Sequence, residues 1–166
     1  MNYTVSDGFP YYISLLKNSN LNECFYSDKN ILLLASLSEE QWKITYAPGK
    51  WSIKQIVGHI TDHERIMTYR ALRFSRKDST PLSGYDQDLM VENSRFNEQT
   101  GNDLLLDLKN VRAATLSLMK SFSTAQLQLT GKAWKFELTV EDFLKATIGH
   151  EIHHINIIKE RYLTLS

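Results

Sequence analysis

Two long helical patterns, far apart in the chain, constrain the fold most because both begin with the same capping device. Ser52 opens the sequence SIKQ and Thr139 opens TVED, and each has the spacing of a capping box, in which two side chains bond each other's backbone N–H groups. Apolar residues then recur at helical intervals. The pattern predicts amphipathic helices from Ser52 to about Arg76 and from Thr139 to about Leu163.

Weaker helical patterns fill most of the remaining chain. Another box, at Ser38–Gln41, predicts a short turn that ends near Tyr46. The three prolines lie outside the strongest patterns, as expected of residues that interrupt helices. Three further segments carry apolar residues at helical spacing, which are Pro10–Lys17, Leu21–Leu37 and Asp103–Phe122.

A long connection and one weak strand complete the pattern. Lys77–Asn102 loses helical periodicity, and its length predicts either a short helix within it or a segment that covers a pocket. Trp134–Leu138 alternates apolar and polar residues, but so short a segment makes only a weak strand. Long amphipathic helices without a convincing sheet predict an all-α four-helix bundle, formed by residues 1–166 as a single domain.

The composition argues against several classes of protein. The 19 Lys and Arg residues balance the 19 Asp and Glu residues without a basic cluster, which argues against a nucleic-acid partner. The longest aliphatic run, Ile31–Ala35, is far shorter than the roughly 20 residues of a membrane span. The first residues lack a signal-peptide pattern, and a lone Cys24 suits a reducing compartment. We therefore expect a cytoplasmic protein that acts on a small molecule.

All five histidines lie in the two strong helical patterns. His59 and His63 are four residues apart, as are His150 and His154, so each pair lies on one helical face, whereas His153 is offset. Imidazoles arranged in this way bind first-row transition metals, and three of them with an open position suit a metal that activates water or a thiol. Two such pairs favour a metal site over histidines that only pack and form hydrogen bonds.

Other chemistries have weaker support in the sequence. Glu151 and His154 form one ExxH motif, which di-iron bundles use twice, and the second copy is missing. There is no serine triad, phosphate loop or CxxC motif, and the three tryptophans are interpreted as core and capping residues. Several charged residues offer contacts for an anionic substrate, although salt bridges and solvated faces are the favoured explanation; they are Glu64, Arg65, Arg70, Arg73 and Arg161.

These residues carry a resemblance to a known family. Residues 48–62, PGKWSIKQIVGHITD, resemble the "W-[ST]-hydrophobic-x-[EQ]…H-[LI]-x-D" signature of the DinB-like (damage-inducible) metalloprotein superfamily. Residues 148–162, IGHEIHHINIIKERY, resemble its closing "GHExHHxxIIxERY" helix, and residues 80–88 look like its thiol-transferase-like branch. The resemblance covers most of the chain beyond residue 40, and two paired motifs at this separation make it fairly specific.

The resemblance implies an architecture and a ligand set. The bundle would have up-down-down-up order, with Lys77–Asn102 as the long crossover connection. One divalent metal, zinc or nickel, would be bound by His59, His150 and His154. His63 departs from the small residue that is usual in this branch, and it is interpreted as a catalytic proton shuttle or a pocket wall, with a fourth ligand as the less favoured alternative.

The resemblance also implies an activity, while leaving alternatives open. Characterised members are mainly transferases of low-molecular-weight thiols, so the leading hypothesis is a metal-dependent S-transferase that uses a small thiol. The alternatives are a metal-dependent hydrolase, a non-catalytic metal-binding stress-response protein and a plain helical interaction module. Arg161 and Tyr162, two turns beyond His154, are the pocket candidates, and His153 is expected to support or pack against the site. A second apolar stripe on the last helix is compatible with a homodimer.

Overall fold

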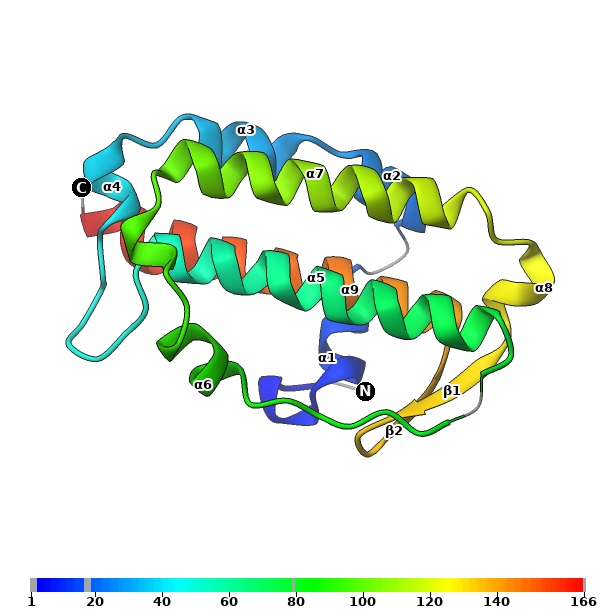
Figure 1. Cartoon of the computed structure of the whole chain (residues 1–166). Helices are drawn as coiled ribbons and strands as arrows, with labels where there is room; N and C mark the ends of the chain where they lie inside the picture. Colours follow the sequence, from blue (N-terminus) through cyan, green and yellow to red (C-terminus); the bar gives the residue numbers. More distant parts are fainter. Residues whose placement is uncertain (1–2, 17–18, 79, 166) are drawn as a thin grey trace.

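A four-helix bundle with a long crossover forms the structure, a computed structural model that describes residues 3–16, 19–78 and 80–165. Figure 1 shows α5 and α7 running in one direction and α3 and α9 in the other, which is the predicted up-down-down-up order. The connection between α5 and α7 returns along the whole bundle. The bundle helices are α2 (Leu21–Tyr26) followed by α3 (Lys29–Ala35), α5 (Ile53–Ser75), α7 (Gly101–Met119) and α9 (Val140–Ile157).

The predicted helix starts are confirmed at atomic detail. Ser52 and Ser38 each form a complete capping box at the start of α5 and of α4 (Glu39–Trp42). The Thr139 hydroxyl accepts a bond from the Asp142 backbone N–H, but the described contacts contain no return bond from Asp142. Beyond α9 the chain continues as a π-helical turn, η3 (Ile158–Tyr162), and a 3-10 turn, η4 (Leu163–Leu165).

The first bundle helix is broken, contrary to the prediction of one helix over Leu21–Leu37. Ser27 is extended and Asp28 leaves the helical region, so α2 ends and α3 begins anew. Serine and aspartate have low helix propensity, but the Asp28 side chain makes no cap bond here, so propensity alone does not account for the break. The helix predicted over Pro10–Lys17 appears as α1 (Phe9–Ser14), and its predicted end lies outside the described residues.

The structure also contains a β-hairpin, where the sequence predicted no convincing sheet. Strands β1 (Thr130–Ala133) and β2 (Phe136–Thr139) pair antiparallel, and Trp134 in their turn has φ 54° and is 59% exposed. Trp134 is therefore not a core residue. The remaining elements are short: η1 (Val5–Asp7), α6 (Gln87–Glu92) and η2 (Phe96–Glu98), the last two in the crossover, and α8 (Thr124–Leu127).

A polar layer divides the apolar core into two clusters. One cluster includes Ile56 and Ile155, and the other includes Phe74 and Phe143, toward the opposite end of α5 and α9. None of the described helices is both long and apolar enough to cross a membrane. Between the two clusters the buried side chains of α5 and α9 are mostly polar or ionisable, namely His59, Thr61, His63, Glu64, His150 and Glu151.

Two glycines allow other segments to lie directly on the helices beside this layer. A Cβ on Gly58 would collide with the ring of Phe96 in η2, and a Cβ on Gly149 would collide with the Tyr12 carbonyl oxygen in α1. Each glycine directly precedes a histidine of the polar layer. The crossover and α1 can therefore pack closely against α5 and α9 at the level of the histidines.

Candidate metal centre

Three imidazoles meet in the polar layer. His59 comes from α5, and His150 and His154 come from successive turns of α9. The Nε2 atom of His150 lies 3.0 Å from Nε2 of His59 and 3.1 Å from Nε2 of His154. The three ligand atoms lie within 4.8 Å of one another, and His59 and His150 are almost fully buried. The structure thus brings together the three residues that the sequence proposes as ligands.

The donor set fits one divalent metal ion. Tetrahedral coordination with Zn–N distances of about 2.0–2.1 Å places ligand nitrogens about 3.3 Å apart, close to the two separations observed here. One Nε2 atom of His150 cannot satisfy two neighbouring imidazoles by hydrogen bonding, because it has either one proton or one lone pair. The second nitrogen, His150 Nδ1, is buried without a hydrogen-bond partner. A metal-binding histidine usually donates its other N–H group to a carboxylate, a backbone carbonyl or water, so this position differs from the common arrangement.

Burial keeps these imidazoles neutral, which is the form that donates a lone pair to a metal. It lowers the pKa of His59 to about 4. The pKa values of His150 and His154 are also well below the ordinary value, first because of burial and second because neighbouring histidines disfavour a second positive charge. All three side chains are therefore ready to bind a cation at neutral pH without first losing a proton.

The same shifts predict acid sensitivity of the metal-free protein. Between pH 6.5 and about 4 the unfolded chain protonates His59 while the folded chain does not, so stability falls as the pH falls through this window. His59 alone contributes about 3 kcal/mol across it. Urea unfolding in the presence of a chelator at several pH values measures the slope, which His59→Gln should reduce. Stability that is constant or increases toward acid would contradict the prediction.

His63 lies beside the cluster but is not part of it. Its ring stacks on His150 with centroids 3.8 Å apart, and its Nδ1 lies 2.5 Å from the Tyr85 hydroxyl. Burial raises the pKa of Tyr85 to about 12, so the phenol stays protonated, and the tautomer of His63 decides whether Tyr85 or Nδ1 is the donor of this bond. The other ring nitrogen, Nε2, is a buried atom without a hydrogen-bond partner. The cluster of three ligand atoms does not include His63.

The other predicted residues lie around the centre. His153 is half-buried, and its Nδ1 lies 3.1 Å from the Tyr11 hydroxyl, away from the cluster. Tyr162 is buried, donates to the Trp51 carbonyl at 2.7 Å and lines a cavity beside His154. Arg161 is exposed against Tyr46, which lines that cavity, whereas Arg161 itself is not among the lining residues described.

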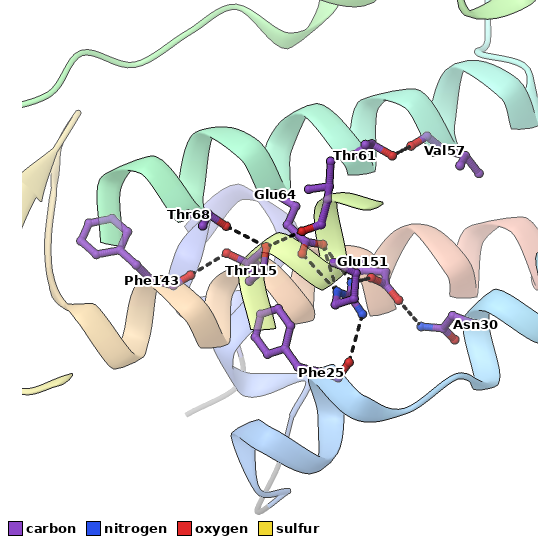
Figure 2. Close-up of polar contacts among 12 residues, drawn as sticks. Phe25, Asn30, Val57, Thr61, Glu64, Thr68, Thr115, Phe143 and Glu151 are labelled. Carbon is purple, nitrogen blue, oxygen red and sulfur yellow. Dashed lines mark hydrogen bonds and ion pairs between the residues drawn. The ribbon is translucent and has the colours of Figure 1, made fainter. Parts of the chain in front are cut away.

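A buried ion cluster lies next to the histidines. Arg112 of α7 donates to Glu64 of α5 at 2.9 Å and also to Glu151 of α9, which follows His150 directly. Figure 2 shows Glu64 and Glu151 directed to one point, with Asn30 and the Phe25 carbonyl beside them. Burial alone would lower the pKa of Arg112, but the two carboxylates outweigh it and raise that pKa. Because Glu64 and Glu151 both pair with Arg112, neither carboxylate is available as an iron ligand, which argues against a di-iron site.

Most of the remaining charged candidates are in surface ion pairs, as the favoured interpretation predicted. Arg65 contacts Asp62 at 3.0 Å and Asp107 at 2.5 Å, with all three side chains partly exposed. Arg73 pairs with Asp78 at 2.5 Å. These residues hold helices and the start of the crossover together, and of the three candidate arginines on α5 they leave Arg70 as the one in a different environment.

Two cavities reach the centre from different sides. One, of about 610 Å³, is lined by His154, Trp51 and Tyr162. The other, of about 640 Å³, is lined by His150 and His63. Gln87, the first residue of α6, lines both, so the crossover covers the pockets as the sequence predicted. His154 therefore faces one cavity, and His150 and His63 face the other.

Fold and site together define a four-helix-bundle protein with a three-histidine centre of the kind that binds a divalent metal. The chain belongs to the DinB superfamily, whose model matches residues 28–158. It is 28% identical over 131 residues to "Putative metal-dependent hydrolase OB0413" of Oceanobacillus iheyensis, which covers 75% of this chain and 72% of that relative.

A solved structure supports the fold independently of close sequence similarity. The chain resembles YfiT from Bacillus subtilis, described as "a probable metal-dependent hydrolase with an unusual four-helix bundle topology", with a TM-score of 0.73. The match covers 99% of this chain and 91% of that chain, at 18% sequence identity. At this identity the likeness concerns the fold alone.

Proposed function

We propose that this protein is a metal-dependent enzyme that transfers a small thiol to an electrophilic small molecule. One zinc or nickel ion would be held by His59, His150 and His154. The observation that carries the proposal is the convergence of three Nε2 atoms at the junction of two cavities. A two-substrate reaction needs room for both reactants beside the activating group, and this arrangement supplies it.

The side chains around the centre supply complementary roles. A divalent metal held by these three imidazoles would lower the pKa of a bound thiol or water and so supply a nucleophile near neutral pH. His63, positioned by Tyr85, presents Nε2 to the 640 Å³ cavity, where this atom would take up the proton of the attacking thiol as a general base. Trp51 packs against the ring of His59 at 4.9 Å and fixes its orientation.

A metal-dependent hydrolase is the second candidate function. The relative from Oceanobacillus iheyensis and the structural neighbour from Bacillus subtilis both have names or descriptions with that activity. Water would then replace the thiol, and the same three histidines would serve. The second cavity favours the transferase, because water needs no binding site of about 600 Å³.

The predictions of one domain over residues 1–166, a cytoplasmic location and a homodimer remain parts of this proposal.

Turnover assays separate these functions. We expect zinc- or nickel-loaded protein to conjugate glutathione, cysteine or coenzyme A to monochlorobimane, forming the sulfur–carbon bond as chloride leaves and the thiol proton passes by way of His63 to solvent. His63→Gln should slow the reaction by about 100-fold while the protein keeps its metal. Metal-dependent ester hydrolysis without any thiol would favour the hydrolase instead. No metal-dependent turnover with any of these substrates would contradict the transferase and support a non-catalytic binding protein.

A further inference from the structure

Arg70 is a buried cation on the wall of the 640 Å³ cavity. Arg70 is only 4% exposed. Its guanidinium donates to the Ser83 carbonyl at 2.8 Å and contacts the Met67 sulfur at 3.4 Å. These contacts use two of the five N–H groups of the guanidinium. No carboxylate of the described residues lies within ion-pair distance of it. Burial lowers the pKa of Arg70, and Tyr85, whose ring centroid lies 5.7 Å from the guanidinium carbon, offsets only part of this effect.

The other arginines show how unusual this position is. Arg112 is as deeply buried, and two carboxylates surround it. Arg65 and Arg73 are more exposed, and each has a carboxylate partner. A buried charge without a counter-charge is costly, and an anion entering from outside would remove that cost. Within the described chain, Arg70 is thus a preformed half of an ion pair whose other half can come from a ligand.

Aromatic side chains make up much of the remaining wall. Phe9 and Phe136 pack with ring centroids 4.8 Å apart, and Trp134 in the hairpin turn packs on Phe136 at 5.7 Å. Trp134 is 59% exposed, so its ring forms an open edge of the cavity. Such a surface suits an apolar or aromatic ligand body.

The distance between Arg70 and His63 along α5 limits the length of the ligand. His63 also lines this cavity, and its Nε2 is buried without a hydrogen-bond partner. It precedes Arg70 by seven residues on α5, which corresponds to a rise of about 10 Å. Asp86, the carboxylate on this wall, accepts bonds from the Asp88 and Leu89 N–H groups and caps α6. Asp86 is also exposed, so solvent screens its charge.

We propose that this cavity binds the electrophilic substrate as an amphiphilic monoanion, such as an aromatic carboxylate. The anionic group pairs with Arg70, the apolar body lies along Phe9, Phe136 and Trp134, and the reacting end faces His63 and His150. The identity of this ligand as a substrate rests on the proposed function. The binding itself is a property of the cavity, so it is measurable without turnover.

Calorimetry with one anionic and one neutral probe tests this inference. Phenylbutyrate has the required length, and phenylbutyramide has the same shape without the charge. We expect the full chain, both chelator-treated and zinc-loaded, to bind the anion at least about tenfold more tightly than the amide. Arg70→Gln should bring this ratio close to one, and Arg70→Lys should retain part of it. Arg73→Gln, on the same helix but paired with Asp78, is the matched control and should leave the ratio unchanged.

A second variant keeps the test informative if Arg70→Gln does not fold. Trp134→Leu changes an exposed residue of the hairpin turn and should weaken both probes several-fold while preserving their ratio. Equal affinity of the wild-type protein for the two probes overturns the inference, as does an Arg73→Gln variant that loses the preference. Charge-selective binding without any catalysis would contradict only the proposed function, whereas catalysis without charge selectivity would contradict only this inference.

Discussion

His150→Gln is expected to abolish stoichiometric metal binding. The wild-type chain should take up one zinc or nickel ion, and the variant should bind it at least about 100-fold more weakly. His150 is the critical position because its Nε2 lies within 3.1 Å of the Nε2 atoms of both other histidines. Glutamine is similar in size but offers no imidazole lone pair at that point. Elemental analysis of the purified protein and competition with a chromophoric chelator measure the two affinities.

His153→Gln is the matched control for this experiment. His153 lies on the same helix, one residue before a proposed ligand, but its Nδ1 bonds Tyr11 outside the cluster. We expect this variant to retain its metal and to keep the stabilisation that the metal provides. That stabilisation is about 3 kcal/mol at a free metal concentration 100 times the dissociation constant. Equal losses of metal affinity in His150→Gln and His153→Gln, or a wild-type chain that takes up no metal, would contradict the proposed metal centre.

Local signals in the sequence were sufficient to predict the bundle helices and the shared face of His150 and His154. The capping boxes at Ser38 and Ser52 are short-range signals that tertiary contacts did not override. Histidines four residues apart must share a helical face, so His150 and His154 were bound to lie together once α9 formed. That α9 packs against His59 on α5 followed from the family resemblance and not from spacing.

Features that depend on tertiary contacts were not predictable in the same way. The break at Ser27 depends on what surrounds it, because Asn30 of α3 donates to Glu151 of α9 and the Phe25 carbonyl approaches Arg112. The hairpin was missed because each of its strands has only four residues and carries little periodicity. Tyr85 lies in a stretch without any helical pattern, so only the structure could reveal its bond to His63.

Arg112 was overlooked, although the sequence does contain a signal for it. It stands four residues after Leu108 and eight after Leu104, on the apolar stripe of α7, where an arginine is out of place unless it is paired. Glu64 and Glu151 were considered separately, as a substrate contact and as part of an ExxH motif. Searching for a buried partner for each charge on an apolar stripe would have connected the three residues.

Arg112→Met is expected to destabilise the protein by about 3–5 kcal/mol, the cost of leaving buried carboxylates without their cation. Glu64 and Glu151 are 1% and 3% exposed, so water cannot replace the arginine. The cluster joins α5, α7 and α9, and Asn30 connects it to α3, so the loss affects the packing of the whole bundle. Urea unfolding of the metal-free protein at neutral pH measures the change in the free energy of unfolding.

Two further variants show whether the uncompensated charge is the cause. Arg65→Met removes an arginine that also has two carboxylate partners, but its side chain is 45% exposed, and we expect a loss below about 1 kcal/mol. Adding Glu64→Gln and Glu151→Gln to Arg112→Met should recover much of the lost stability, because the buried negative charges are then gone. If the triple variant is no more stable than Arg112→Met, the loss comes from packing of the arginine stem and not from its charge. Equal effects of Arg65→Met and Arg112→Met would show that burial does not set the strength of these pairs.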